Sequence, residues 1–157
     1  MHEQFAEPTK QYATHIIDGS GLPKEKVLEK AEEITLRANK IKLYDTADVG
    51  SALITQDGNI YYGVSIGHFC GIGSCAENQA IGSMISNGEK VIKTIVSIWY
   101  EQKSKKFRGV IPPCGKCREM IKQTSKKNWE AYVIVSNSKK VKLKELLPYA
   151  WRPTLDK

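Results

Sequence analysis

Cysteine and glutamate residues in two separate segments place the strongest constraint on how this chain can fold. Cys75 and Glu77 stand near the middle of the sequence, and Cys114 and Cys117 follow Pro113 in a second segment. Cysteine thiolates commonly hold zinc, and a catalytic zinc site needs three protein ligands with one position left for water. If one ion binds all three cysteines, the fold must bring the two segments together.

Other interpretations of these residues stay open. The Cys-x-x-Cys spacing also suits a thioredoxin-like redox pair, but such a pair explains neither Cys75 nor Glu77. Cys70, the remaining cysteine of the chain, could complete a closed four-sulfur site with a purely structural role. Taken singly, each cysteine could be a small buried apolar residue, and Glu77 could be an ordinary acidic residue at a helix start.

The length and charge of the chain narrow the class of protein. Its 157 residues suffice for one domain. No apolar run is long enough to span a membrane, and the first residues lack the pattern of a secretory leader, so we expect a cytoplasmic protein. The formal net charge of +7 suits a nucleic-acid partner. However, the lysines are scattered and their densest groups, 103–106 and 139–140, lack interleaved aromatic residues, so we expect a solvated surface and no nucleic-acid track.

The first half of the chain predicts an arm, a helix and a hairpin. Residues 1–22 carry little pattern and end in a turn composition, so they are predicted to precede a single domain over 23–157. Apolar residues at helical spacing follow Pro23 and predict an amphipathic helix through Val27, Ala31, Ile34, Ala38 and Ile41. Two β-rich runs, 49–55 and 60–66, flank a glycine-containing turn and predict a β-hairpin.

The second half predicts helices that alternate with strands. A loop over 67–74 leads to a helix over 75–86 that Ser74 caps and Asn87-Gly88 close. The remaining expected elements are a buried strand over 91–100, a charged loop over 101–109, a helix over 114–122, a strand over 131–136 and a short helix over 143–147. This alternation predicts an α/β fold with three layers, α/β/α, around a mixed sheet.

The expected helices place the candidate zinc ligands in their first turns. Cys114 and Cys117 are three residues apart, a spacing that brings both sulfurs to one helix face. Positive helix ends, together with Lys116 and Arg118, are expected to offset the negative charge of three thiolates. Glu77 is too close in sequence to Cys75 to share its direction, so it should stand beside the metal and transfer protons between water, substrate and departing amine.

In combination, these motifs resemble the cytidine deaminase superfamily, especially the small proteins typified by cytidine deaminase and blasticidin-S deaminase. The likeness runs from about Tyr44 to Pro153, and its anchors are Asp57-Gly58, Ile60-Tyr61, Gly63, Cys75-Ala76-Glu77, Pro113-Cys114-Gly115, Cys117-Arg118 and Glu145-Leu146-Leu147-Pro148. The resemblance implies a central mixed five-stranded sheet flanked by helices and a homotetramer with sites near subunit contacts. It also implies one Zn²⁺ per subunit, held by Cys75, Cys114 and Cys117, with Glu77 as the acid/base.

The resemblance further implies hydrolytic deamination of a small molecule. The substrate would be a free cytosine nucleoside or analogue, such as cytidine, deoxycytidine or blasticidin S, and the products its uracil form and ammonia. Ser65 and Asn78 depart from the family pattern, which has an asparagine at the first position and, in three-cysteine members, an arginine at the second. Substrate contacts are expected at Ser65, His68, Phe69, Ala76, Lys116 and Trp151.

Two other functions stay open. One is a deaminase of another free base or nucleoside, such as a purine, or of RNA, which must enter such a site single-stranded or with its base flipped out. The other is a catalytically silent module that binds zinc only for structure.

Overall fold

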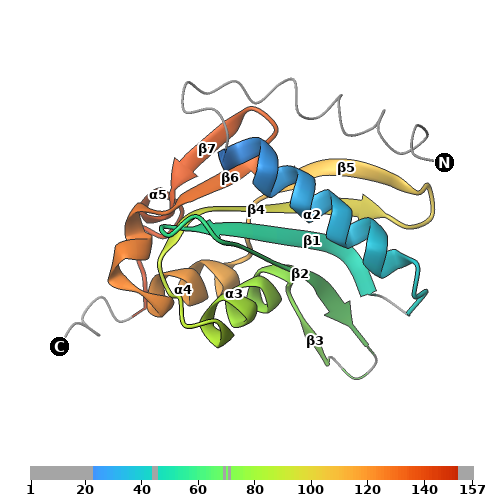
Figure 1. Ribbon diagram of the computed structural model, residues 1–157, viewed down its shortest axis with the longest axis horizontal. Helices are drawn as coiled ribbons and strands as arrows, with labels where there is room; N and C mark the ends of the chain where they lie inside the picture. The colour runs from blue at the N-terminus through green and yellow to red at the C-terminus, as the bar shows by residue number, and fades with distance from the viewer. Residues whose placement is uncertain (1–22, 44–45, 69, 71, 152–157) are drawn as a thin grey trace.

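The structure, a computed structural model, describes residues 23–43, 46–68, 70 and 72–151, so the arm predicted over 1–22 lies outside it. The described residues form three layers (Figure 1). Helix α2 (Pro23–Asn39) covers one face of a central sheet, and α3 (Ala76–Ser86) and α4 (Gly115–Thr124) cover the other. The expected α/β/α class is confirmed.

The described residues contain a mixed sheet of seven strands, where five were expected. Its order is β3 (Gly73–Ser74), β2 (Ile60–Gly67), β1 (Thr46–Thr55), β4 (Ile92–Glu101), β6 (Tyr132–Ser136) and β7 (Lys139–Lys142), with β5 (Lys106–Ile111) also paired to β4. Strands β4 and β6 run parallel, and the other pairs are antiparallel. The predicted β1–β2 hairpin and the buried strand β4 are confirmed.

Three strands occupy segments that the sequence predicted to be loops. The charged segment after β4 turns back as β5, Lys139–Lys142 pairs with β6 as β7, and Gly73–Ser74 pairs with the end of β2 as β3. Because the outermost strand of a sheet projects charged side chains into water, β7 needs no apolar run. A search for alternating apolar residues therefore did not detect the lysine-rich strand β7.

Strands β1 and β4 contribute to two apolar cores because successive residues of a strand point to opposite faces. Leu53 and Ile95 face α3 and α4, whereas Ala52 and Val96 face α2. The core on the α3 side also contains Ile81, Met84, Ile92, Ile121, Val133 and Leu143, and the core on the α2 side contains Val27, Leu28, Ala31, Ile54, Ile98 and Ile134. The core on the α3 side holds the first turn of α3 against the sheet.

The other helices lie close to their predicted positions. Helix α2 ends at Asn39, so Ile41 lies beyond it and is 67% exposed, which corrects one member of the predicted apolar stripe. Downstream of α4, the 3₁₀ helix η3 (Lys126–Glu130) precedes β6, and α5 (Leu143–Leu146) follows β7. None of the helices in the described residues is long and apolar enough to cross a membrane.

Glu32 on α2 is a buried carboxyl and makes the stability of the fold pH-dependent. Burial, with a smaller contribution from repulsion by Glu29, raises its pKa from an ordinary 4.5 to about 7. Between these two values the folded state holds more protons than the unfolded state, so stability should fall as pH rises from 5 to 7.5, by at most about 3 kcal/mol. Urea unfolding at both pH values should show this fall, and Glu32→Gln should reduce it. An identical pH dependence in the variant would contradict this assignment.

Candidate metal centre

The first turns of α3 and α4 carry the predicted ligands. Cys75 is the N-cap residue of α3 and Cys114 that of α4, each with an extended backbone. The predicted cap of α3, Ser74, is therefore wrong by one residue. Because a helix start presents unsatisfied N–H groups and the positive end of the helix dipole, both termini favour negative charge at the sulfurs.

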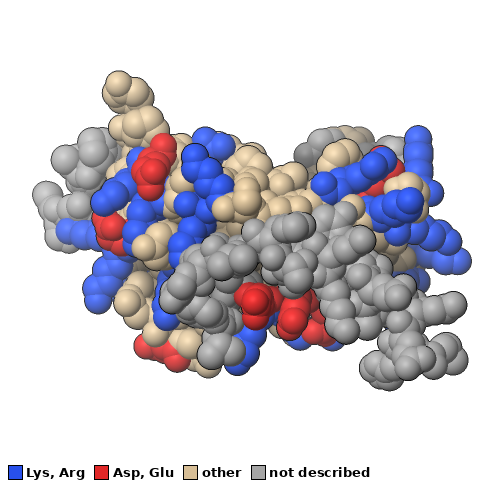
Figure 2. Space-filling model, turned by 90° about the horizontal axis from the view of Figure 1, so that it is seen from above, with Lys and Arg blue, Asp and Glu red and all other residues tan. Residues whose placement is uncertain are grey.

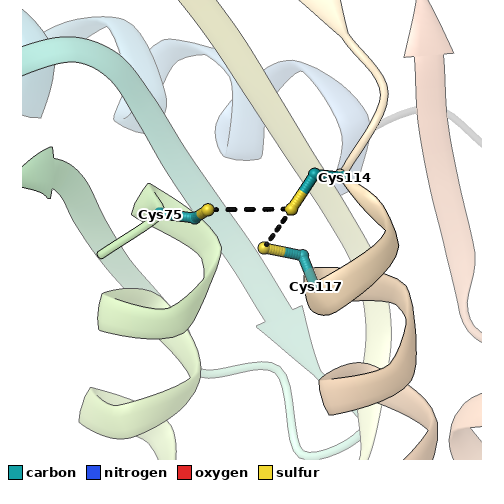
Figure 3. A group of neighbouring side chains, drawn as sticks. All are labelled: Cys75, Cys114 and Cys117. Atoms are coloured by element: carbon teal, nitrogen blue, oxygen red, sulfur yellow. Dashed lines mark hydrogen bonds between the residues drawn. The ribbon is translucent and has the colours of Figure 1, made fainter. Parts of the chain in front are cut away.

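The sulfur atoms of Cys75, Cys114 and Cys117 converge on one point (Figure 3). All three lie within 4.8 Å of one another. The Cys75 and Cys114 sulfurs are 3.7 Å apart, and those of Cys114 and Cys117 are 3.5 Å apart. Tetrahedral zinc with bonds of about 2.3 Å places its sulfur ligands about 3.8 Å apart. The observed spacing therefore fits a single zinc ion.

The surroundings of the sulfurs also favour a bound cation. Cys117 is fully buried, and burial, followed by the charge of Glu77, raises the pKa of its thiol well above the usual range. Burial likewise raises the pKa of the Cys75 thiol. The Cys114 thiol differs, because hydrogen bonds from Cys117 and Cys75 outweigh burial and lower its pKa. Thiolates at Cys75 and Cys117 are therefore unfavourable without a positive charge beside them, and thiolate ligands suit zinc among the common divalent metals.

Glu77 lies against this sulfur cluster. Its side chain is only 4% exposed although it stands in the first turn of α3. The Cys117 thiol approaches Oε2 of Glu77 at 3.5 Å. The structure thus brings together the predicted acid/base and all three predicted ligands, from segments far apart in the sequence.

Cys70 lies outside the cluster. It is a free, exposed cysteine with a positive φ of 62°, and the metal-ligand group in the described residues comprises Cys75, Cys114 and Cys117. The described part of the chain therefore supplies three sulfur ligands, as a catalytic zinc site requires, rather than the four of a closed structural site.

Arg118 contacts backbone carbonyls, a role that the sequence did not reveal. Its Nε donates to the carbonyl oxygen of Pro113 at 2.8 Å, and its Nη1 donates to that of Leu146 at 3.1 Å. These bonds fix the residue before Cys114 and connect α4 to the end of α5. Arg118 therefore positions the ligand segment, whereas Lys116 is exposed to solvent.

The Asn78 side chain lies against one of the ligand sulfurs. Its Oδ1 lies 3.7 Å from Sγ of Cys117. An asparagine amide presents either an acceptor or two donors after a half-turn. When Cys117 is a thiolate, the amide can therefore donate an N–H to the sulfur and stabilise its negative charge.

Asn78→Leu should accordingly weaken zinc retention about 10-fold, a typical effect of losing a hydrogen bond to a metal ligand. Competition with a chromogenic chelator at constant pH measures this change. Gln56→Leu, on the exposed turn between β1 and β2, serves as a control that should retain zinc normally. Equal retention in Asn78→Leu and Gln56→Leu would show that the amide contributes nothing to the site.

Several predicted substrate contacts have definite places in the structure. Ala76 is fully buried in the first turn of α3. Oγ of Ser65 accepts a hydrogen bond from the backbone N–H of Val49 at 3.0 Å. His68 is exposed, and Trp151 is 62% exposed. Phe69 lies outside the described residues. The contact of these residues with a substrate stays a prediction.

The backbone N–H of Trp151 anchors the C-terminal segment to α4. It donates to the Glu119 carboxylate at 2.6 Å, which holds this segment beside the helix that carries Cys117.

Gly63 on β2 allows α3 to lie directly on the strand. A Cβ atom at this position would lie 2.7 Å from the Ala80 nitrogen and 2.9 Å from the Ala76 carbonyl oxygen, and would overlap Cβ of Gln79. Because two of these neighbours are backbone atoms, Gly63→Ala must push α3 away from the sheet.

We expect Gly63→Ala to lower the unfolding free energy by about 1–3 kcal/mol and to weaken zinc binding. Denaturant unfolding and zinc analysis measure these changes. Gly82→Ala on α3, where an added Cβ meets nothing within 4 Å, should be neutral or stabilising. Equal stability of the two variants would contradict the proposed close approach.

Hydrolytic removal of an amino group needs an activated water and a group that moves protons, and the fold and the site together define a zinc-dependent hydrolytic deaminase. Comparison with protein families supports this class. The family model described as the cytidine and deoxycytidylate deaminase zinc-binding region matches residues 23–133. The chain belongs to this family.

Individual relatives agree with the family. The chain is 35% identical over 127 residues to blasticidin-S deaminase of Bacillus cereus, covering 77% of this chain and 89% of the relative. It is 26% identical over 123 residues to cytidine deaminase of Halalkalibacterium halodurans, covering 76% of this chain and 89% of the relative. The crystal structure of cytidine deaminase from Mycobacterium tuberculosis matches the fold with a TM-score of 0.64 at 20% identity, over 83% of this chain and 98% of that one.

Proposed function

We propose that this protein deaminates a free cytosine nucleoside or a cytosine nucleoside analogue, leaving the uracil form and ammonia. The observation that carries the proposal is the buried Glu77 carboxylate beside three convergent cysteine sulfurs. The substrate class is supported by the relatives described above, which are a blasticidin-S deaminase and a cytidine deaminase.

Glu77 would move the protons of the reaction. When held by the three cysteines, zinc supplies the Lewis acid that activates water for attack on the carbon bearing the amino group. Glu77 would accept the proton of that water and deliver it to the ring nitrogen, and would later carry the proton of the newly added hydroxyl group to the departing amine. Its burial shields it from bulk water, which strengthens its interactions with the reacting atoms.

Six further residues would bind and orient the substrate. We assign this role to Ser65, His68, Phe69, Ala76, Lys116 and Trp151, with Lys116 and Trp151 selecting the group attached to the cytosine ring. A cytosine ring is flat and polar at its edge, so an aromatic face and hydrogen-bonding groups suit it.

A screen for ammonia release tests the proposal and identifies the substrate. The compounds are cytidine, deoxycytidine, blasticidin S, cytosine, adenosine and guanine. At least one of the first three should release ammonia, and its ultraviolet spectrum should shift to that of the uracil form. Release from adenosine or guanine alone, or from none of the six by the zinc-loaded protein, would refute the substrate class.

An RNA substrate is less well supported by the surface. On the visible part of the face in Figure 2, basic side chains gather toward both ends of the molecule and acidic side chains lie among them. One aromatic residue, Tyr132, does lie beside two lysines, a contact between strands that the sequence alone did not predict. However, the ammonium groups of Lys140 and Lys142 lie over its ring at 4.4 and 3.6 Å, where a stacked base would have to bind.

We also propose that the protein is a cytoplasmic homotetramer. Exposed apolar side chains, including Ile72, Ile85, Tyr149 and Trp151, offer surface that association would bury. Light scattering coupled to size exclusion should give a mass four times that of the 17.6 kDa chain. A monomeric mass at micromolar concentration would contradict this assembly.

A further inference from the structure

The central sheet continues beyond the metal centre. In Figure 3, α3 and α4 run away from the cysteines in the direction in which the β1 arrow points, and the sheet extends past the cysteines in the other direction. Gly63, Ser51 and Ser97 pair across β2, β1 and β4. This row lies under the first turn of α3, because a Cβ atom at Gly63 would lie 2.9 Å from the Ala76 carbonyl oxygen. The following row of the sheet therefore lies past the start of α3.

Trp99 belongs to that following row, on the same face of the sheet as the metal centre. Along β4, Ile95 packs in the core on the α3 side, and Oγ of Ser97 donates to Oγ of the buried Ser51 at 3.1 Å. Alternate residues of a strand share a face, so Trp99 points the same way as these two residues. It lies two residues beyond Ser97, a step of about 6.8 Å along the strand.

Ser65, one of the predicted substrate contacts, lies in the same row as Trp99. Its Oγ accepts the backbone N–H of Val49 at 3.0 Å, and Val49 pairs directly with Trp99. Ser65 also follows Gly63 by two residues on β2, so both face α3. A hydroxyl group and an indole ring therefore stand in one row across β2, β1 and β4, next to the row under the first turn of α3.

The indole of Trp99 is open to a ligand in the described part of the chain. Trp99 is 42% exposed, and its partner on β5 is Gly109, which has no side chain to cover the ring. Trp99 also lines an open hollow of about 790 Å³, together with Leu43 beyond the end of α2 and Lys103 in the β4–β5 turn. This volume lies in the range of small-molecule sites.

We propose that Trp99 is a specificity-determining residue that holds the sugar group of the substrate while the cytosine ring lies at the metal centre. The face of an indole suits the carbon-bound hydrogens of a sugar ring, and its N–H and the Ser65 hydroxyl suit sugar hydroxyl groups. Because the sugar does not react, this contact is equally strong before and during the reaction, so it lowers KM rather than raising kcat. This role rests on the proposed deaminase activity and adds a residue to the substrate contacts named above.

Steady-state kinetics of zinc-loaded variants with the best substrate of the ammonia screen test this role. Trp99→Leu should raise KM about 10-fold or more, since it removes the indole surface that the sugar covers, and should change kcat less than twofold. Trp99→Phe keeps an aromatic face and should restore most of the binding. Trp129→Leu is the matched control, because it makes the same change on η3, after the end of α4. An unchanged KM in Trp99→Leu, or an equal rise in Trp129→Leu, would overturn the role.

Tryptophan fluorescence distinguishes failure of this role from failure of the proposed activity. Zinc-loaded Glu77→Gln protein is titrated with cytidine, deoxycytidine and blasticidin S, so that binding is followed without turnover. At least one compound should quench the fluorescence, and the quench should disappear in Glu77→Gln/Trp99→Phe. A quench by a compound from which the unchanged protein releases no ammonia would support the role of Trp99 and refute the activity.

Two other outcomes would overturn the role of Trp99 itself. One is the absence of a quench with all three compounds, or a quench that persists in the double variant. The other is a lower mass of Trp99→Leu in light scattering with an unchanged KM, which would place Trp99 in a contact between subunits.

Discussion

Glu77→Gln should lower kcat for the best substrate by about 10²- to 10⁴-fold, the usual contribution of a general acid–base group. Glutamine keeps the size of the side chain and an acceptor for the Cys117 contact, but it cannot carry the proton. Zinc content and thermal unfolding should therefore match those of the unchanged protein. Steady-state assays on zinc-loaded samples, together with metal analysis, measure both parts of this expectation.

Glu33→Gln is a suitable control because Glu33 lies exposed on α2, on the opposite side of the sheet from the cysteines. That variant should keep full activity. Near-normal turnover in Glu77→Gln would show that another group moves the protons. Loss of zinc together with activity would mean that Glu77 supports the metal rather than the chemistry.

Cys117→Ala should produce the second large effect, which is loss of zinc and of stability together. Because a structured metal site forms only in the folded chain, the free energy of binding zinc adds to the free energy of folding. Removal of one of three ligands should leave less than about a tenth of the zinc after dialysis and lower the unfolding free energy by several kcal/mol. Metal analysis and denaturant unfolding give the two values.

Cys70→Ala is the matched control for this experiment, since Cys70 is exposed and lies outside the sulfur cluster. It should keep one zinc per chain and normal stability. Full zinc occupancy in Cys117→Ala, or loss of zinc in Cys70→Ala, would show that the ligand set is wrong. A chelator applied to the unchanged protein should reproduce the loss of stability seen in Cys117→Ala.

The metal centre could be predicted from the sequence because its ligands are local to two helix starts. Cys114 and Cys117 share a face by helical geometry alone, and Cys75 and Glu77 stand within one turn of each other. The pairing of these two segments depends on the layers of the fold, which the alternation of strands and helices indicated. The position of Glu77 against the Cys117 sulfur follows from that packing.

The features that the sequence did not predict depend on contacts between residues far apart in the chain. Strand β7 has three lysines among its four residues, and β5 opens with Lys106, Phe107 and Arg108, so neither shows an apolar run of strand length. The bonds from Arg118 to Pro113 and Leu146 connect two segments whose sequence likeness to the family was visible but whose contact was not. In the sequence Asn128 likewise looks like an ordinary polar residue, because its three hydrogen bonds to backbone groups are visible only in the structure.

X-ray absorption spectroscopy at the zinc edge tests the central claim most directly, because it counts the sulfur and light-atom neighbours of the metal. We expect one zinc per chain with three sulfur neighbours at about 2.3 Å and one oxygen neighbour at about 2.0 Å. Four sulfur neighbours, or a chain that binds no zinc, would contradict the catalytic site described above.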